Sequence, residues 1–256
     1  MSASLRRLRS FLGALSLLLG VALAMPAPSS AQLTTDRPGF GVAAPTVSGG
    51  AFQAEVGYAF NGNGRTSQEL GQVLLRYGVN ERFELRGGVN SYVINESPVD
   101  NGYTGTSVGA KYELTSSRSA RLSGVASLAL PNGTGPFDTA DDRARQQLAL
   151  AFDGMLGEGL TLSVNGGVSF FYSAGRQNDR FLRWLFIPTL SFGMTESTSA
   201  YVGYAGFYNE FRNQNWVEGG LTVLSNPDTQ FDLNTGLRLD ERSDAFFIGL
   251  GVSHRF

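Results

Sequence analysis

The last eleven residues of the chain alternate between apolar and small or polar side chains and end on an aromatic residue. One face of an extended segment would carry Phe246, Ile248, Leu250, Val252, His254 and Phe256, and the other Phe247, Gly249, Gly251, Ser253 and Arg255. Successive side chains of a strand point to opposite faces, so the pattern suits a wall between lipid and an aqueous interior. The segment predicts the last strand of a transmembrane β-barrel. Its terminal aromatic resembles the signal that such barrels present to their assembly machinery.

The same alternation recurs along most of the chain. In the first such segment Phe52, Val56 and Phe60 share one face, while Gln53 and Glu55 share the other. Similar segments follow around residues 73–79, 83–90, 105–114, 120–130, 147–156, 160–172, 181–194, 199–208, 215–223, 230–239 and 244–256. A tilted strand of roughly ten residues crosses a bilayer. The sequence therefore predicts an all-β fold, a transmembrane antiparallel up-and-down β-barrel of about twelve strands.

The connections between these segments alternate in length. Tight turns are expected at residues 80–82, 115–119, 157–159, 195–198 and 224–229, and longer polar loops at 94–103, 131–146 and 173–180. Outer-membrane barrels have short periplasmic turns and longer extracellular loops. The alternation favours a barrel over a soluble sandwich, and an even strand count places both ends of the barrel on the periplasmic side.

The first residues have the features of an export signal. Three arginines within the first nine residues precede an apolar stretch, residues 11–23, that is too short to span a membrane. Small residues suited to signal cleavage follow. We predict a cleaved signal peptide at residues 1–31, a periplasmic N-terminal segment at 32–49 and an outer-membrane β-barrel at 50–256.

Composition narrows the classes of function. Without the signal peptide the chain holds 17 basic and 22 acidic residues, a net charge near −5. This balance argues against a nucleic-acid partner, which requires a basic surface. The chain contains no cysteine, which excludes disulfides, a lipoprotein anchor, zinc–thiolate sites and iron–sulfur clusters. We expect no cofactor.

Charged residues occupy the polar face of the predicted strands. A charge facing lipid near the midplane costs roughly 2–4 kcal/mol, so these side chains are expected to point into the lumen. The candidates are six acids and six bases: Glu55, Arg76, Glu84, Arg86, Lys111, Glu113, Arg121, Asp153, Arg183, Glu218, Asp232 and Arg238. The balance favours cross-strand ion pairs and argues weakly against a strongly charge-selective pore. For each residue a structural role outweighs a ligand role.

Aromatic residues gather near the ends of the predicted strands. They suit the interfacial girdles of a barrel, where a ring meets both lipid and water. The girdle candidates are Tyr58, Phe60, Tyr77, Phe83, Tyr172, Trp184, Tyr208, Trp216 and Phe256. Ligand stacking by Trp184 or Trp216 is the alternative, and the girdle is favoured.

No catalytic or metal site is expected. The single histidine, His254, follows Ser253 directly, so the two side chains point to opposite faces of a strand and cannot act as base and nucleophile together. Asp138, Asp141 and Asp142 could bind Ca²⁺, but neighbouring arginines and the lack of EF-hand spacing favour a solvated loop. A hydrolase that works through carboxylates alone is a third reading of the function.

Several motifs, in order along the chain, resemble one outer-membrane family. They are residues 35–40 (TDRPGF), 52–58 (FQAEVGY), 79–88 (VNERFELRGG), 109–112 (GAKY), 130–133 (LPNG) and 231–237 (FDLNTGL). The set is similar to the transporter-like family named for the meta-pathway of phenol degradation. The resemblance implies an outer-membrane protein that passes small aromatic or other hydrophobic compounds, and it supplies no catalytic residues.

The segment that precedes the first strand invites a separate hypothesis. Residues 35–45 hold Arg37 and two prolines. We hypothesise that they tuck into the periplasmic mouth of the barrel and narrow the pore, with Arg37 at the mouth. Unchanged conductance after deletion of residues 32–45 would contradict this idea.

Two functions lead for this predicted monomeric barrel in the cell outer membrane. The first is a passive channel or transporter for small, aromatic or hydrophobic solutes, with a lumen shaped by paired Arg and Glu side chains. The alternative is a non-conducting structural or binding barrel with a plugged lumen. The expected partners are the lipid bilayer, the barrel-assembly machinery that reads the strand ending in Phe256, and a small-molecule solute. No nucleic-acid partner is expected.

Overall fold

A computed structural model describes residues 33–137, 143–172, 180–240 and 244–256. The predicted signal peptide and the loop aspartates Asp138, Asp141 and Asp142 lie outside these ranges. The described chain is built of strands, with two short 3-10 turns, η1 (Pro98–Asp100) and η2 (Gly135–Phe137). The described residues include no helix that is long and apolar enough to cross a membrane.

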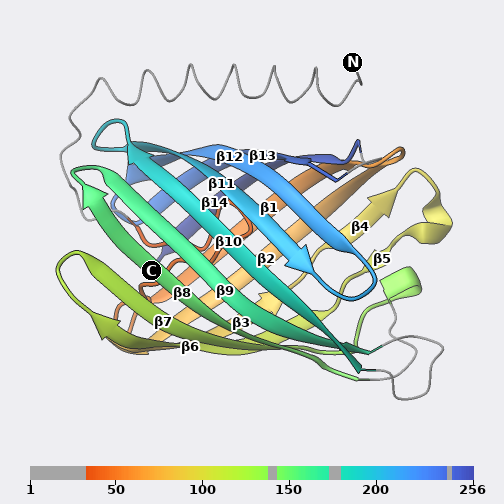
Figure 1. The fold of residues 1–256 in the computed structure, drawn as a ribbon, viewed down its shortest axis with the longest axis horizontal. Coiled ribbons are helices and arrows are strands. Elements are labelled where there is room, and N and C mark those ends of the chain that lie inside the picture. The colour runs from red at the N-terminus through yellow and green to blue at the C-terminus, as the bar shows by residue number, and fades with distance from the viewer. Residues whose placement is uncertain (1–32, 138–142, 173–179, 241–243) are drawn as a thin grey trace.

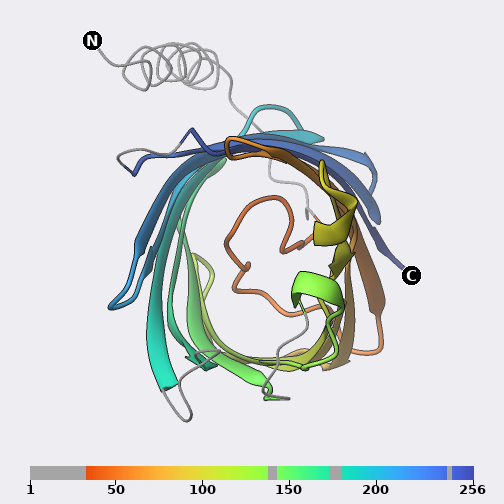
Figure 2. The same cartoon turned by 90° about the vertical axis from the view of Figure 1, so that its right-hand side faces the viewer.

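The strands form one antiparallel sheet that closes into a barrel (Figures 1 and 2). In chain order they are β1 (Phe52–Gly62), β2 (Thr66–Asn80), β3 (Phe83–Val89), β4 (Tyr92–Asn95), β5 (Gly102–Tyr103), β6 (Thr106–Ser116), β7 (Ala120–Ala129), β8 (Arg145–Gly157), β9 (Leu160–Tyr172), β10 (Arg180–Gly193), β11 (Thr198–Tyr208), β12 (Asn213–Asn226), β13 (Thr229–Arg238) and β14 (Phe246–Arg255). From β6 to β14 each strand pairs with the next one in the chain, β1 pairs with β2, and β1 also pairs with β14 to close the ring.

The described strands make twelve wall positions, as the alternation predicted. β3 and β4 both pair with β2, so together they make one interrupted wall strand. β6 pairs with β3 and β5 pairs with β4, so β5 and β6 together make the next interrupted wall strand. The second strand begins at Thr66, earlier than predicted. The sequence pattern missed its first residues because a bulge interrupts the alternation of the strand. Gly71 adopts a positive φ of 72° there, so Leu70 faces outward and Gln72 inward.

The distribution of polar and apolar side chains is the inverse of that in a water-soluble protein. The largest fully buried side chains are Arg76, Lys111, Gln53, Gln230, Glu55, Glu84 and Glu218. The exposed large apolar side chains include Leu85, Leu148, Leu150, Trp184, Phe186, Phe231, Ile248 and Leu250. Every backbone group of a closed barrel is paired and its apolar face can meet lipid. The fold is therefore that of an outer-membrane β-barrel, and its place is the outer membrane.

The two ends of the barrel differ. Short turns join β2 to β3, β6 to β7, β8 to β9, β10 to β11 and β12 to β13 at one end, where the backbone N–H of Phe256 also donates to the carbonyl of Phe52 (2.8 Å). Short turns mark the periplasmic end, and the connections that hold η1 and η2 lie at the opposite, extracellular end.

The segment before β1 lies inside the ring of strands rather than merely at its mouth. Figure 2 shows it as an orange loop that crosses the centre of the barrel. It reaches β1 beside Gly78 on β2, where the backbone N–H of Gly50 donates to the Gly78 carbonyl (2.7 Å). Residues 33–49, which we call the lumen segment, therefore occupy part of the interior of the barrel.

Candidate functional site

Asp36 of the lumen segment lies at the centre of a buried ion cluster. Its carboxylate pairs with Arg86, with the Lys111 ammonium at 3.2 Å and with the Arg76 guanidinium at 3.7 Å. Burial alone raises the pKa of Asp36, but these three cations hold that pKa far below its usual range. Asp36 therefore stays charged inside the barrel.

Two wall carboxylates complete the cluster. Arg76 donates to Glu55 on β1 and to Glu84 on β3, at 2.8 Å in each case, and Arg86 donates to Glu84 at 2.9 Å. Three acids, including Asp36, therefore face three bases, and the charge balances only with the lumen segment in place. Breaking one member of such a buried network leaves an uncompensated charge, which is costly.

Arg37 lies across the junction of β1 and β14, deeper than the mouth position expected for it. Its guanidinium donates to Asp232 on β13 (3.2 and 3.3 Å), to Gln72 on β2 (3.0 Å) and to the carbonyl of Leu250 on β14 (3.1 Å). Gly57 and Gly251, which pair with each other, lie beneath it. A Cβ at Gly57 would approach the guanidinium to 2.1 Å, so a larger residue there would displace the Arg37 side chain from this position.

We expect Gly57→Ala to release the lumen segment from the wall, because the added methyl group occupies the position of the Arg37 guanidinium. Hydrogen bonds to charged groups contribute about 1.5–3 kcal/mol, so the backbone amides of residues 36–44 should exchange about tenfold faster or more. Hydrogen–deuterium exchange of the peptide measures this. Gly166→Ala is the matched control, because a Cβ there meets nothing within 4 Å. Equal exchange in both variants would contradict the fit of Arg37.

Phe40 anchors the segment in an aromatic socket on the inner wall. Its ring lies 5.6 Å from Phe207, 5.8 Å from Trp216 and 5.4 Å from Phe247, measured between ring centroids. The assignment of Trp216 to the lipid girdle is therefore wrong. Trp216 shares the inner face of β12 with Glu218, whereas Trp184 is exposed on the outer face of β10.

Backbone groups of the segment are bound by wall side chains. Glu55 accepts the N–H groups of Asp36 and Arg37, and Glu84 accepts that of Val47 (2.8 Å). Asp153 accepts the N–H of Ala44 at 2.9 Å, and Glu218 that of Phe40 at 3.1 Å.

Among the described residues, Asp153 and Glu218 form no ion pair with a base, so they differ from the expected ion pairs. Asn165 also holds the segment, by donating to the carbonyl of Val42 (2.9 Å).

The remaining candidates lie toward the rims of the lumen. Arg121 is half-exposed at the periplasmic end, 3.8 Å from Glu113, and Arg238 pairs with Asp240. Arg183 lies in the extracellular half, with its guanidinium carbon 4.4 Å from the centre of the Phe171 ring. The twelve predicted residues thus lie on the inner side of the barrel, and eight of them contact the lumen segment, whereas Glu113, Arg121, Arg183 and Arg238 make no such contact in the described part of the chain.

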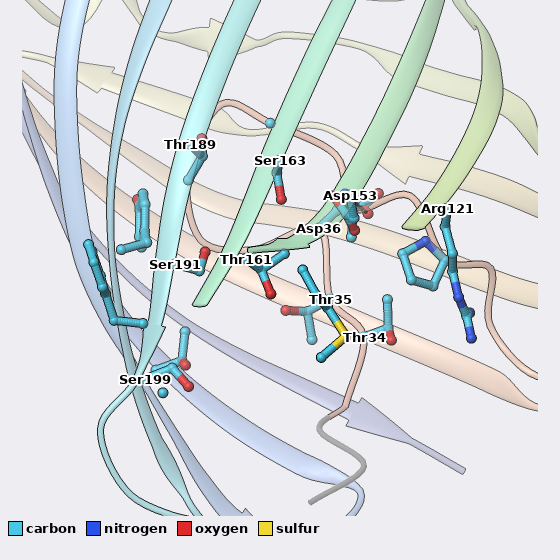
Figure 3. A pocket seen from close by; sticks show the side chains of 18 of the residues that line it. Thr34, Thr35, Asp36, Arg121, Asp153, Thr161, Ser163, Thr189, Ser191 and Ser199 are labelled. Carbon is cyan, nitrogen blue, oxygen red and sulfur yellow. Dashed lines mark hydrogen bonds between the residues drawn. The ribbon is translucent and has the colours of Figure 1, made fainter. Parts of the chain in front are cut away.

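A cavity of about 620 Å³ lies between the lumen segment and the wall formed by β7 to β13. Hydroxyl side chains line it, and Figure 3 shows Thr161 and Ser163 of β9 and Thr189 and Ser191 of β10 facing the segment. The cavity extends to the periplasmic turns at residues 117–119 and 195–196. Apolar side chains such as Leu33, Ile187 and Phe192 share the lining, so the cavity is a space of mixed polarity on the periplasmic side of the barrel.

The histidine and serine at the end of the chain do not form a catalytic pair. Ser253 is fully buried on the inner face of β14. His254 lies on the other face, where its Nδ1 is 2.8 Å from the Thr229 hydroxyl and its ring packs on Phe256.

The closed barrel, its polar interior and its apolar exterior define an outer-membrane barrel of porin architecture. The chain belongs to the family described as "Putative MetA-pathway of phenol degradation", whose model matches residues 35–256. No match was found among curated proteins.

Solved structures share the fold at low sequence identity. The KdgM porin is 10% identical with a TM-score of 0.56, and the alignment covers 79% of this chain and 99% of that one. The NanC porin is 9% identical with a TM-score of 0.58, over 78% and 98% of the two chains. The translocator domain of the autotransporter NalP from Neisseria meningitidis is 11% identical with a TM-score of 0.52, over 82% and 90%.

Proposed function

We propose that the protein is a passive channel for small, aromatic or hydrophobic solutes, with the lumen segment as an internal constriction. The observation that carries this proposal is how the segment is held. Besides apolar contacts of residues such as Phe40, Val42 and Ala44, hydrogen bonds and ion pairs hold the segment to the wall, and a cavity lined in part by hydroxyl groups lies beside it. Polar contacts can be exchanged for water, so such a segment can narrow an aqueous path without sealing it.

Two further observations support the proposal. The porin architecture is common to KdgM and NanC. The family description refers to phenol degradation, and aromatic rings line the inner wall at Phe171, Phe207, Trp216 and Phe247. We infer that a small aromatic compound is the kind of solute that this interior suits.

Conductance tests the proposal directly. Refolded protein lacking residues 1–31 should give steady single-channel currents in a planar bilayer. Phenol and small aromatic acids should reduce those currents in a concentration-dependent way, because a solute in the lumen excludes ions. Glucose at equal concentration is the control for viscosity and osmotic effects.

The alternative is a non-conducting barrel plugged by the lumen segment. It is favoured by the buried charges of Asp36, Arg76 and Glu84, which fix the segment firmly. Silence of a correctly folded barrel in the bilayer, with and without aromatic solutes, would support this alternative and overturn the channel.

A further inference from the structure

Two arginines in the extracellular half of the lumen lie against aromatic rings. Arg183 lies near the start of β10 and Arg145 is the first residue of β8, and Phe171, near the end of β9, lies between them. The Arg183 guanidinium is 4.4 Å from the centre of the Phe171 ring and 5.4 Å from that of Phe207, and Arg145 is 5.7 Å from the Phe171 ring. Both cations therefore gather over one ring on the inner wall.

These two arginines differ from the other bases of the lumen. Arg37, Arg76, Arg86 and Lys111 each bind a carboxylate. Within residues 33–137, 143–172, 180–240 and 244–256, the side chains of Arg145 and Arg183 contact aromatic rings and no acid. No acid of this part of the chain occupies their N–H donors, so an anion can bind there and reduce the repulsion between the two cations.

A carboxylate lies on the opposite side of the barrel. Glu69 on β2 accepts hydrogen bonds from Asn61 (3.0 Å), Gln72 (2.8 Å) and Ser91 (3.1 Å), and in the described part of the chain it has no basic partner. β2 and β10 are six wall strands apart in either direction around the ring. Glu69 therefore faces Arg183 across the lumen.

The strand register places the two residues at similar depth. Followed through β1, β14, β13, β12 and β11, it leads from Glu69 to Ser191 on β10. Followed through β3, β6, β7, β8 and β9, it leads from Leu75 to Leu182. Glu69 lies six residues before Leu75 on β2, and β2 and β10 run in the same direction. By this second route the level of Glu69 on β10 is therefore about six residues before Leu182. In a sheared barrel the true level lies midway between the two routes, which is close to Arg183.

The chemistry of this arrangement selects a particular ligand. Guanidinium groups bind carboxylates through paired N–H donors, and rings bind rings by stacking. Phe181 stacks on Phe171 at 5.3 Å with an interplanar angle of 16°, and Phe211 packs edge-on against Phe181 at 5.3 Å. The field between Glu69 and the arginines orients an anion toward β8 to β10.

We propose that Arg183 and Arg145, with Phe171, Phe181 and Phe207, form a binding subsite for an aromatic carboxylate in the extracellular half of the lumen. This inference rests on the proposed function, because the solute must enter the lumen. It names the substrate class more narrowly: an aromatic ring that carries a negative charge.

Binding to the refolded protein in detergent tests the subsite without any current. Fluorine NMR with 4-fluorobenzoate should show saturable binding, and neutral 4-fluorobenzyl alcohol should bind about tenfold more weakly or worse. Arg183→Gln should lower the affinity for 4-fluorobenzoate about tenfold or more, and Phe171→Leu about threefold. Arg145→Gln is a second variant should Arg183→Gln fail to fold.

Arg82→Gln is the matched control, because Arg82 also lies over a ring, Tyr112, but at the periplasmic turn and bonded to backbone carbonyls. Equal affinity of wild type and Arg183→Gln for 4-fluorobenzoate overturns the subsite, as does equal binding of the neutral alcohol. Steady conductance without such binding overturns the subsite and leaves the channel. Arginine-dependent binding to a barrel that stays silent in a bilayer supports the subsite and overturns the channel.

Discussion

Deleting residues 33–47 is expected to raise the single-channel conductance of the barrel several-fold. These residues cross the centre of the ring and bind wall strands on several sides, so their removal widens the narrowest part of the path (Figure 2). The deletion also removes Asp36 from Arg76, Arg86 and Lys111. It removes Arg37 from Asp232 as well, so the net charge of the lumen does not change, and the reversal potential in a salt gradient should stay near the wild-type value.

The opposite manipulation supplies the matched control. The chain contains no cysteine, so a disulfide between cysteines at positions 42 and 165 can be made alone. The Asn165 side chain already bonds to the backbone of Val42 in this place. The oxidised variant should show a low, steady conductance close to that of wild type. Addition of reductant should leave this conductance near the wild-type value. A deletion variant that folds but conducts like wild type would show that the lumen segment does not limit the path.

The second large effect is expected from Asp36→Asn. The variant leaves three buried or nearly buried cations with two carboxylates, and removing one partner of a buried network costs about 3–5 kcal/mol. The barrel should unfold at a lower urea concentration, and the amides of residues 36–44 should lose protection. Glu158→Gln, in the exposed β8–β9 turn, is the control and should unfold like wild type.

The difference between wild type and Asp36→Asn should depend on pH in one direction. The pKa of Asp36 is lowered in the folded protein, so its contribution to stability is complete above the unfolded pKa of about 3.9 and declines as the pH falls below that value. Urea titrations should therefore give a constant difference between about pH 5 and pH 8 and a smaller one below about pH 4. A difference that grows in acid would contradict the assigned ion cluster.

The wall of the barrel was predictable from sequence because a period of two determines which side chains meet lipid. The terminal strand shows this directly, with Ile248 and Leu250 exposed and Phe247 and Ser253 buried. The same phase, counted from Glu218, also predicts Trp216 to lie inside. Trp216 was nevertheless assigned to the lipid girdle, because it is aromatic and lies near the end of a strand.

The partners of the lumen residues could not be derived from the same pattern. The two-residue alternation of side chains along a strand predicts that Glu55, Arg76 and Glu84 point inward. Asp36 lies before the first strand, where no such alternation predicts its position. Its pairing with three bases is a long-range contact between the chain start and β2, β3 and β6. Likewise, alternation places Arg183 inside but does not reveal that Glu69 faces it, because that depends on strand number and shear.

The position of Arg37 has a consequence for assembly. A barrel becomes a barrel only when its first and last strands meet, and Arg37 touches both sides of that seam, through Gln72 on one side and Asp232 and Leu250 on the other. We expect Arg37 to favour this register, because it makes all these bonds where Gly57 lies opposite Gly251. A seam closed with its strands slipped by two residues would leave the arginine without its acceptors. The contacts that hold Arg37 in the lumen would thus also stabilise the correctly closed ring.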